Sequence, residues 1–173
     1  MIRHLVVLML IFLLASCQVV KIGEPKGLGA LAIIVDIDAP GGRYMCRKIT
    51  LYMKPDDNGK SGAVESLEVF ASNNNSYALF SNIPPNKYNI NKVRCYAKKG
   101  YILNDSYSYL EYQADLSVSV LPNTLEVPAF KVVGWQENDY FEYGTEFIDS
   151  SQREEWLDKI KKENDTTGWD LTF

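Results

Sequence analysis

Two carboxylates near the end of an apolar stretch are the side chains of this sequence that could act together as an acid and a base. Asp36 and Asp38 stand two residues apart, so on a strand their side chains would share one face. Carboxylates so placed could be the general acid and general base of a hydrolase. An aspartate shortly before Pro40-Gly41 is also a common turn initiator, and no other group is expected to converge on the pair. Hydrolysis at this pair therefore ranks third, behind two binding functions.

The N-terminal stretch indicates where the mature protein begins. Arg3 and His4 precede an apolar run over residues 5–15, which is shorter than the about 20 apolar residues that a membrane-spanning helix needs. A positive start, a short apolar run and small residues at its end are typical of a secretory signal peptide. Leu14-Ala15-Ser16-Cys17 resembles the lipobox of bacterial lipoproteins, whose cysteine receives a diacylglyceryl group and becomes the first residue after cleavage. The resemblance implies that residues 1–16 are removed and that Cys17 carries the lipid.

The same resemblance implies a location in the bacterial cell envelope, with the protein attached to a membrane by its lipid. In bacteria with two membranes, an aspartate directly after the lipidated cysteine usually keeps a lipoprotein at the inner membrane. Gln18 stands at that position here, so we expect the outer membrane. Residues 17–29 are rich in Gly and carry little apolar surface, which predicts a flexible tether.

The amino-acid composition argues against several classes of catalytic, metal and nucleic-acid-binding sites. The only histidine is His4. If the signal peptide is cleaved, Ser-His-Asp triads, Cys-His pairs and His-containing zinc or iron sites cannot form. With 18 basic against 22 acidic residues, the chain also lacks the basic excess that nucleic-acid binding needs. We predict a protein that is not an enzyme, holds no metal or cofactor and binds no nucleic acid.

Residues 30–133 are predicted to be a series of short strands. Residues 30–38 are rich in Ile and Val, which is typical of a buried strand, and residues 45–53 and 114–120 alternate as half-buried strands do. The turn after Pro55 contains Asn58-Gly59, the dipeptide favoured in hairpins, and departs from the order of a calcium loop. The spacing predicts a mainly β fold, an antiparallel Ig-like or prealbumin-like β-sandwich of about seven or eight strands.

One longer motif resembles a known family. Phe80-Ser81-Asn82-Ile83-Pro84-Pro85-Asn86-Lys87-Tyr88 is similar to the Phe-x-Asn-Ile/Val-Pro-Pro-Gly-x-Tyr signature of carboxypeptidase-regulatory-like, or transthyretin-like, β-sandwich domains. Asn86 replaces the family's Gly, at a position where a left-handed backbone is expected and Asn is tolerated. Tyr88 is expected to face the core. The resemblance implies a sandwich that serves as an accessory folding or binding module, with no catalytic residues.

The remaining cysteines pose an open alternative. Cys46 and Cys95 both fall in predicted strands of an exported chain, where an oxidising compartment permits a disulfide. Strand alternation places Cys46 with Lys48 and Thr50 on a solvent-facing side, whereas Cys95 lies on an apolar side. A disulfide needs Cα atoms within about 7 Å. A disulfide and two buried thiols therefore both remain possible.

A tyrosine-rich hairpin is the first candidate binding surface. It contains Tyr101, Tyr107, Tyr109 and Tyr112. Such rings could form a platform for a sugar or a protein surface, although Tyr is also simply a good strand former. We expect an accessory module that docks to other envelope proteins and, as the alternative, a surface lectin or adhesin that binds carbohydrate through this hairpin.

Residues 134–173 differ from the rest in being acidic and aromatic, and are predicted to be a segment separate from the sandwich. Ser151 and Glu154 form a capping-box pattern that predicts a helix over about 151–163, with Trp156, Leu157 and Ile160 on one face. So short a helix must bury that face somewhere. We favour docking on the protein's own sandwich over docking on a partner, within a small second core that also takes four further residues: Trp135, Trp169, Leu171 and Phe173.

Overall fold

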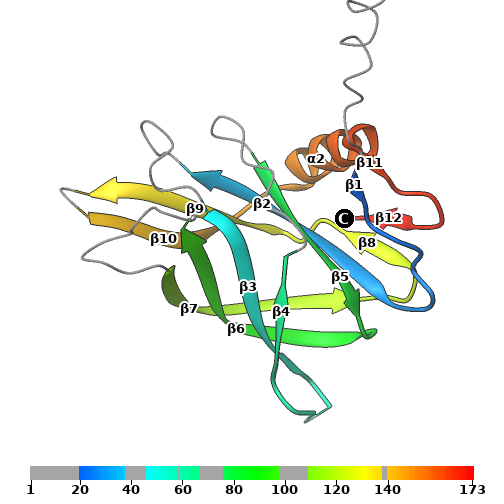
Figure 1. Ribbon diagram of the computed structural model, residues 1–173, viewed down its shortest axis with the longest axis horizontal. Helices are drawn as coiled ribbons and strands as arrows, with labels where there is room; N and C mark the ends of the chain where they lie inside the picture. The colour runs from blue at the N-terminus through cyan, green and yellow to red at the C-terminus, as the bar shows by residue number, and fades with distance from the viewer. Residues whose placement is uncertain (1–19, 38–45, 58, 67–75, 98–108, 138–139) are drawn as a thin grey trace, which may run out of the picture.

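The computed structural model describes residues 20–37, 46–57, 59–66, 76–97, 109–137 and 140–173. These residues form two large β-sheets that face each other and a separate two-stranded sheet, with one helix, α2 (Ser150–Glu163), packed on the outside of the first large sheet (Figure 1). This confirms the predicted mainly β sandwich with a short C-terminal helix.

The first sheet is built around β2 (Gly29–Ile37). β5 (Ser76–Ile83) pairs antiparallel with β2. β8 (Thr124–Glu126) and β9 (Phe130–Glu137) pair parallel with β2, and Pro128 lies in the gap between them, as expected of a residue that cannot donate to a sheet. β10 (Tyr140–Phe147) and β12 (Asp170–Thr172) then pair with β9 and β8. The sheet is thus mixed, unlike the antiparallel arrangement expected from the sequence.

The second sheet is antiparallel throughout and has the order β4 (Gly62–Glu65), β3 (Cys46–Pro55), β6 (Asn86–Ala97), β7 (Tyr109–Val120). A hairpin joins β3 to β4. In its turn, Asp57 accepts hydrogen bonds at 3.1 Å from the backbone N–H of Gly59 and from the side-chain amide of Asn86. Both carboxylate oxygens of Asp57 are therefore used within the fold.

Two hydrophobic cores lie on opposite faces of the first sheet. Leu31, Ile33 and Val35 of β2 point between the two sheets, into the larger core. Ala32 and Ile34 point the other way, into a second core beneath α2. The continuous apolar run of β2 reflects burial on both faces.

The Pro84-Pro85 connection behaves as its sequence predicts in one respect only. Tyr88 is buried, and its hydroxyl donates a 2.7 Å hydrogen bond to the carbonyl oxygen of Pro84. The left-handed residue is Asn82, with φ of 59°, rather than Asn86, which is not among the positive-φ positions in the described part of the chain. Asn86 instead closes the connection with its side chain, which accepts a 2.7 Å hydrogen bond from the N–H of Lys87.

Cys46 and Cys95 are joined by a disulfide, with Cα atoms 5.4 Å apart. The expectation that Cys46 faces solvent with Lys48 was wrong, because both cysteines are 1% exposed. Between Cys46 and Lys48 the pairing of β3 with β6 shifts by one residue. Such a bulge turns the residues before it to the opposite face of the sheet, so Cys46 points into the larger core.

Helix α2 docks on the protein itself. Leu157 and Ile160 are buried in the second core. The side chain of Arg153 fixes the other end of the helix by donating a 2.7 Å hydrogen bond to the carbonyl oxygen of Val127. The capping box is formed by Asp149 and Gln152, two residues earlier than the predicted pair of Ser151 and Glu154.

The expected membership of the second core was only partly right. Trp169 is buried in it and Leu171 packs against it. Trp135 and Phe173 are 40% and 48% exposed and do not contribute. Trp135 lies on β9, and β10 follows within the same sheet, so the boundary predicted at residue 133 does not separate two segments. The apolar residues of β10 show little periodicity, so the sequence pattern did not predict that β10 is a strand of the sandwich.

The predicted tether is part of the fold from Val20 onward. β1 (Val20–Lys21) pairs parallel with β11 (Asn164–Asp165), directly after α2. Ile22 is 6% exposed in the second core, and the indole N–H of Trp169 donates a 2.8 Å hydrogen bond to the carbonyl oxygen of Gly23. The tether was expected to be flexible because few of its residues are apolar; this one buried side chain and backbone pairing are enough to fix it.

Candidate functional site

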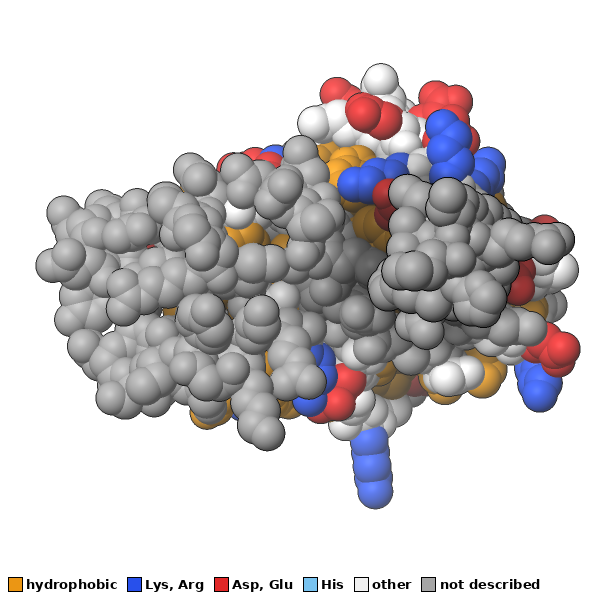
Figure 2. All heavy atoms as spheres, turned by 45° about the horizontal axis from the view of Figure 1, so that its top comes forward, with side chains coloured by type: hydrophobic (Ala, Val, Ile, Leu, Met, Phe, Trp, Pro, Cys, Tyr) orange, Lys and Arg blue, Asp and Glu red, His pale blue; other side chains and the backbone are white. Residues whose placement is uncertain are grey.

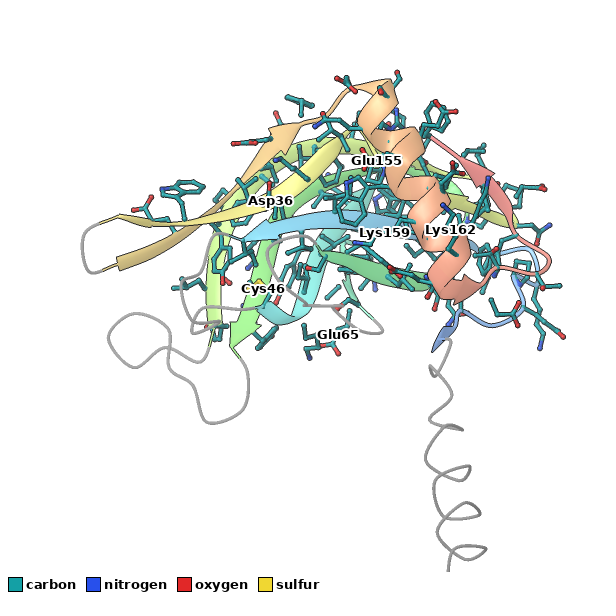
Figure 3. All side chains as sticks on the ribbon, turned by 90° about the horizontal axis from the view of Figure 1, so that it is seen from above. Asp36, Cys46, Glu65, Glu155, Lys159 and Lys162 are labelled. Atoms are coloured by element: carbon teal, nitrogen blue, oxygen red, sulfur yellow. A yellow bond between two sulfur atoms is a disulfide. The ribbon has the colours of Figure 1, made fainter. Side chains whose placement is uncertain are left out.

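The carboxylate pair predicted for hydrolysis is represented by one member, since Asp38 lies outside the described residues. Asp36, which is labelled in Figure 3, accepts a 2.7 Å hydrogen bond from the ammonium group of Lys131. Lys131 also lies 3.3 Å from Glu146. The hydrogen bond with Asp36 is the main cause of the raised pKa of Lys131. Asp36 of β2 thus forms an ion pair with Lys131 of the neighbouring strand β9.

The predicted tyrosine platform divides between the two faces of β7. Tyr101 and Tyr107 lie outside the described residues. Tyr109 is on the outer face of the second sheet, whereas Tyr112 points inward and packs against the larger core, where burial raises its pKa. Residues three apart on a strand point to opposite faces, so Tyr109 and Tyr112 cannot share one platform.

The structure assembles a different surface around Tyr109. On the outer face of the second sheet, three adjacent strands bring nine side chains into register in three rows. We call this the tyrosine-cation face; its rows are Lys48, Tyr96, Tyr109; Thr50, Arg94, Glu111; and Tyr52, Lys92, Gln113. The second residue of each row belongs to β6, and the first and third belong to β3 and β7.

Arg94 is the centre of the tyrosine-cation face. Its Nε and Nη2 both donate to one carboxylate oxygen of Glu111, at 3.0 and 2.8 Å, and its Nη1 donates to the hydroxyl of Tyr96 at 3.2 Å. The guanidinium also lies over the ring of Tyr109, 4.3 Å from its centroid. Thr50 is buried beside it in the same row. The guanidinium is therefore held by contacts from several directions.

Two lysines occupy the remaining ring faces. Lys92 lies 4.3 Å from the ring centroid of Tyr52, and Lys48 lies 4.6 Å from that of Tyr96. Lys48 also forms a 2.7 Å ion pair with Glu65 of β4. Each cation is attracted electrostatically by the aromatic ring over which it lies. The result is a surface of fixed rings and charges.

The charges on this face alter each other's titration. The pKa of Arg94 is raised, first by its hydrogen bond with Tyr96 and then by that with Glu111. The pKa of Glu111 is lowered, chiefly by the hydrogen bonds from Arg94. Ionised Glu111 therefore stabilises the folded protein at pH values above the ordinary carboxyl pKa, and this contribution is lost as the pH falls through its lowered value.

A pH-dependent stability difference is the expected consequence. Glu111→Gln should lower the free energy of unfolding at pH 7 by about 1 kcal/mol or less, because the pair is partly exposed. The difference from the wild type should shrink as the pH falls below about 4. Thermal unfolding at several pH values measures it, with Glu65→Gln, at the more exposed pair, as control. A difference that stays constant down to acid pH would contradict the assigned pairing.

The sequence contains a signal for this face that was missed. Lys92, Arg94 and Tyr96 alternate with buried residues, and Tyr109, Glu111 and Gln113 alternate with partly buried ones. Each set alone resembles an ordinary solvated strand face. The signal becomes specific only when the register of β3, β6 and β7 is known.

Two further site types find no support in the described part of the chain. No group of three or more His, Cys, Asp or Glu residues there is arranged to hold a metal ion. Within the same ranges, no helix is long and apolar enough to cross a membrane.

Comparisons with known proteins were made for family, sequence and structure. No protein-family model matches the chain, and no curated protein sequence matches it significantly. Among solved structures, it is similar to a "putative cell adhesion protein" from Bacteroides fragilis NCTC 9343, with 12% sequence identity and a TM-score of 0.43. The similarity covers 71% of this chain and 46% of the other, so the chain spans less than half the length of that protein.

Proposed function

We propose that this protein is a lipid-anchored, non-catalytic binding module of the bacterial cell envelope, which docks to a protein partner through the tyrosine-cation face. The anchor is inferred from the resemblance of Leu14-Ala15-Ser16-Cys17 to a lipobox. The single observation that supports the docking surface is the fixed arrangement of Arg94 among Tyr96, Tyr109 and Glu111.

The residue types of this face suit a protein partner. Tyr and Arg are enriched among the residues that contribute most to protein interfaces. Side chains that are already held by neighbouring groups lose little conformational freedom on binding, which favours affinity. Lys48, Lys92 and Arg94 outnumber Glu65 and Glu111, on a chain whose net charge is −4. A polar, moderately acidic partner surface complements this arrangement.

Carbohydrate binding is less well supported by the same geometry. A sugar ring commonly binds by stacking on an open aromatic face. Cations lie over the rings of Tyr52, Tyr96 and Tyr109. A flat sugar would have to displace those cations, so the lectin or adhesin alternative is the second choice.

Photo-cross-linking in cells tests this function. A photo-reactive amino acid at Gln113, which is exposed on the face, should give one discrete cross-linked protein species, and one at Ser151 on α2 should not. Arg94→Met, which keeps most of the side-chain stem, should abolish that species, while Lys60→Met in the β3–β4 turn should not. Membrane fractionation of Cys17→Ala cells tests the anchor, because the protein should become soluble.

Two outcomes would overturn the proposal. A cross-linked species that persists in Arg94→Met, with the variant's melting temperature unchanged, would exclude the face as the docking surface. A Cys17→Ala protein that stays with the membranes and still migrates as a processed species would exclude the lipid anchor.

A further inference from the structure

The distance between the proposed lipid and the folded domain is very short. Cys17 and Val20 are three residues apart, and β1 begins at Val20. Three residues span at most about 10–11 Å when fully extended. The headgroup layer on each side of a bilayer is roughly 5–8 Å thick. A lipid on Cys17 would thus hold β1 at the headgroups or directly above them.

β1 cannot move away from the body of the protein without breaking several contacts. Its backbone pairs with β11, and Ile22 is buried beneath α2. At the next residue, the chain is held by the hydrogen bond from Trp169 to Gly23, and then by a 2.7 Å hydrogen bond from the N–H of Gly27 to the side-chain oxygen of Asn123. The lipid therefore keeps the β1 end of the sandwich close to the membrane.

The C-terminal end of α2 lies close to β1. β11 follows the helix directly, and the two lie side by side with β1 in Figure 1. Figure 3 shows Glu155, Lys159 and Lys162 along the exposed side of the helix, with Lys162 toward the end near β1.

Charge is distributed unevenly along α2. Between Arg153 near its start and Glu163 at its end, acidic residues precede the basic ones: Glu154, Glu155 and Asp158 come first, and Lys159, Lys161 and Lys162 follow. Both signs are visible on the upper part of the molecule in Figure 2. The helix dipole also favours lysines at this end, and the short tether brings the same end close to the headgroups.

The acidic groups at this end of the helix are engaged by the fold. Glu163 accepts a 2.8 Å hydrogen bond from the hydroxyl of Tyr77, and Asp165 accepts one of 3.1 Å from the N–H of Thr167. Lys159 lies 4.3 Å from the ring centroid of Trp156, which is partly exposed. Lysine and tryptophan are residue types that favour the membrane-water boundary.

We infer that the surface formed by β1, β11 and the C-terminal half of α2 lies against anionic lipid headgroups of the membrane that holds the anchor. This inference rests on the lipid anchor of the proposed function. The tyrosine-cation face is on the outer side of the second sheet, so the two sheets separate it from α2 (Figure 1). The protein thus contacts lipid through one side and presents the opposite side to its partner.

Site-specific fluorescence quenching of the lipidated protein tests the orientation. A fluorophore is attached to a cysteine introduced at Lys162 or, as the matched control, at Ser117, which is exposed on the outer face of β7. The protein is reconstituted in vesicles of equal parts phosphatidylethanolamine and phosphatidylglycerol, with nitroxide-labelled headgroups. Quenching at position 162 should be several-fold stronger than at position 117. It should weaken in vesicles of phosphatidylcholine alone, and also when a Gly/Ser insert lengthens the chain between Gln18 and Val19.

The possible failures are distinguishable. If the lipidated protein does not float with the vesicles, the proposed anchor fails. If it floats but positions 162 and 117 are quenched equally, the orientation is wrong while the anchor stands. Quenching at position 162 that is the same in phosphatidylcholine would exclude the contribution of the lysines to headgroup contact.

Discussion

Replacing Cys46 and Cys95 together by alanine should lower the free energy of unfolding by about 4 kcal/mol, because the disulfide closes a long loop of the unfolded chain. The two cysteines are 49 residues apart, and the entropy removed from the unfolded state grows with the logarithm of that separation. Both side chains are 1% exposed, so the two alanines also leave small cavities. Denaturant unfolding under non-reducing conditions measures the loss.

The wild type in a reducing buffer is the matched control for this experiment. It should lose nearly as much stability as the double alanine variant, because it lacks the same covalent link but keeps the side chains. A variant that unfolds within about 1 kcal/mol of the oxidised wild type would show that the link contributes little in this protein.

Ile160→Ala should lower the free energy of unfolding by about 3 kcal/mol, since Ile160 is 0% exposed on the buried face of α2 and its truncation leaves a cavity. Lys161→Ala, at the next position but exposed, should change it by less than about 0.5 kcal/mol. Comparing these two variants distinguishes a helix docked on the sandwich from a helix that docks on a partner. Were α2 a partner-binding tail, the isolated protein would melt at the same temperature in both variants.

Local pattern was sufficient for most of the architecture. The apolar run of β2 predicts a strand buried on both faces, and the alternation along β7 predicts a strand buried on one face. The stripe of Leu157 and Ile160 predicts a docked helix. Each of these features depends on residues close together in the chain. β10 escaped notice because its apolar residues lack that periodicity.

What escaped sequence reasoning depends on contacts between distant segments. The inward turn of Cys46 results from a one-residue shift in the pairing of β3 with β6, for which the residues of β3 alone give no sign. The tyrosine-cation face likewise needs the register of three strands, and Arg94 is central to it only because Tyr96, Tyr109 and Glu111 arrive from β6 and β7. The single buried side chain of Ile22 fixes a segment whose composition predicts a tether.

The pairing of β1 with β11 also governs how the molecule responds to pulling. Force between a lipid on Cys17 and a partner on the tyrosine-cation face would reach β1 first, because it is the strand nearest the anchor, and its pairing with β11 extends over two residues. Release of residues 20–28, as far as the start of β2, would give a connection of at most about 30 Å of extended chain while leaving the two large sheets folded. The connection between lipid and domain is thus short without force, and residues 20–28 would lengthen it only under a pulling force.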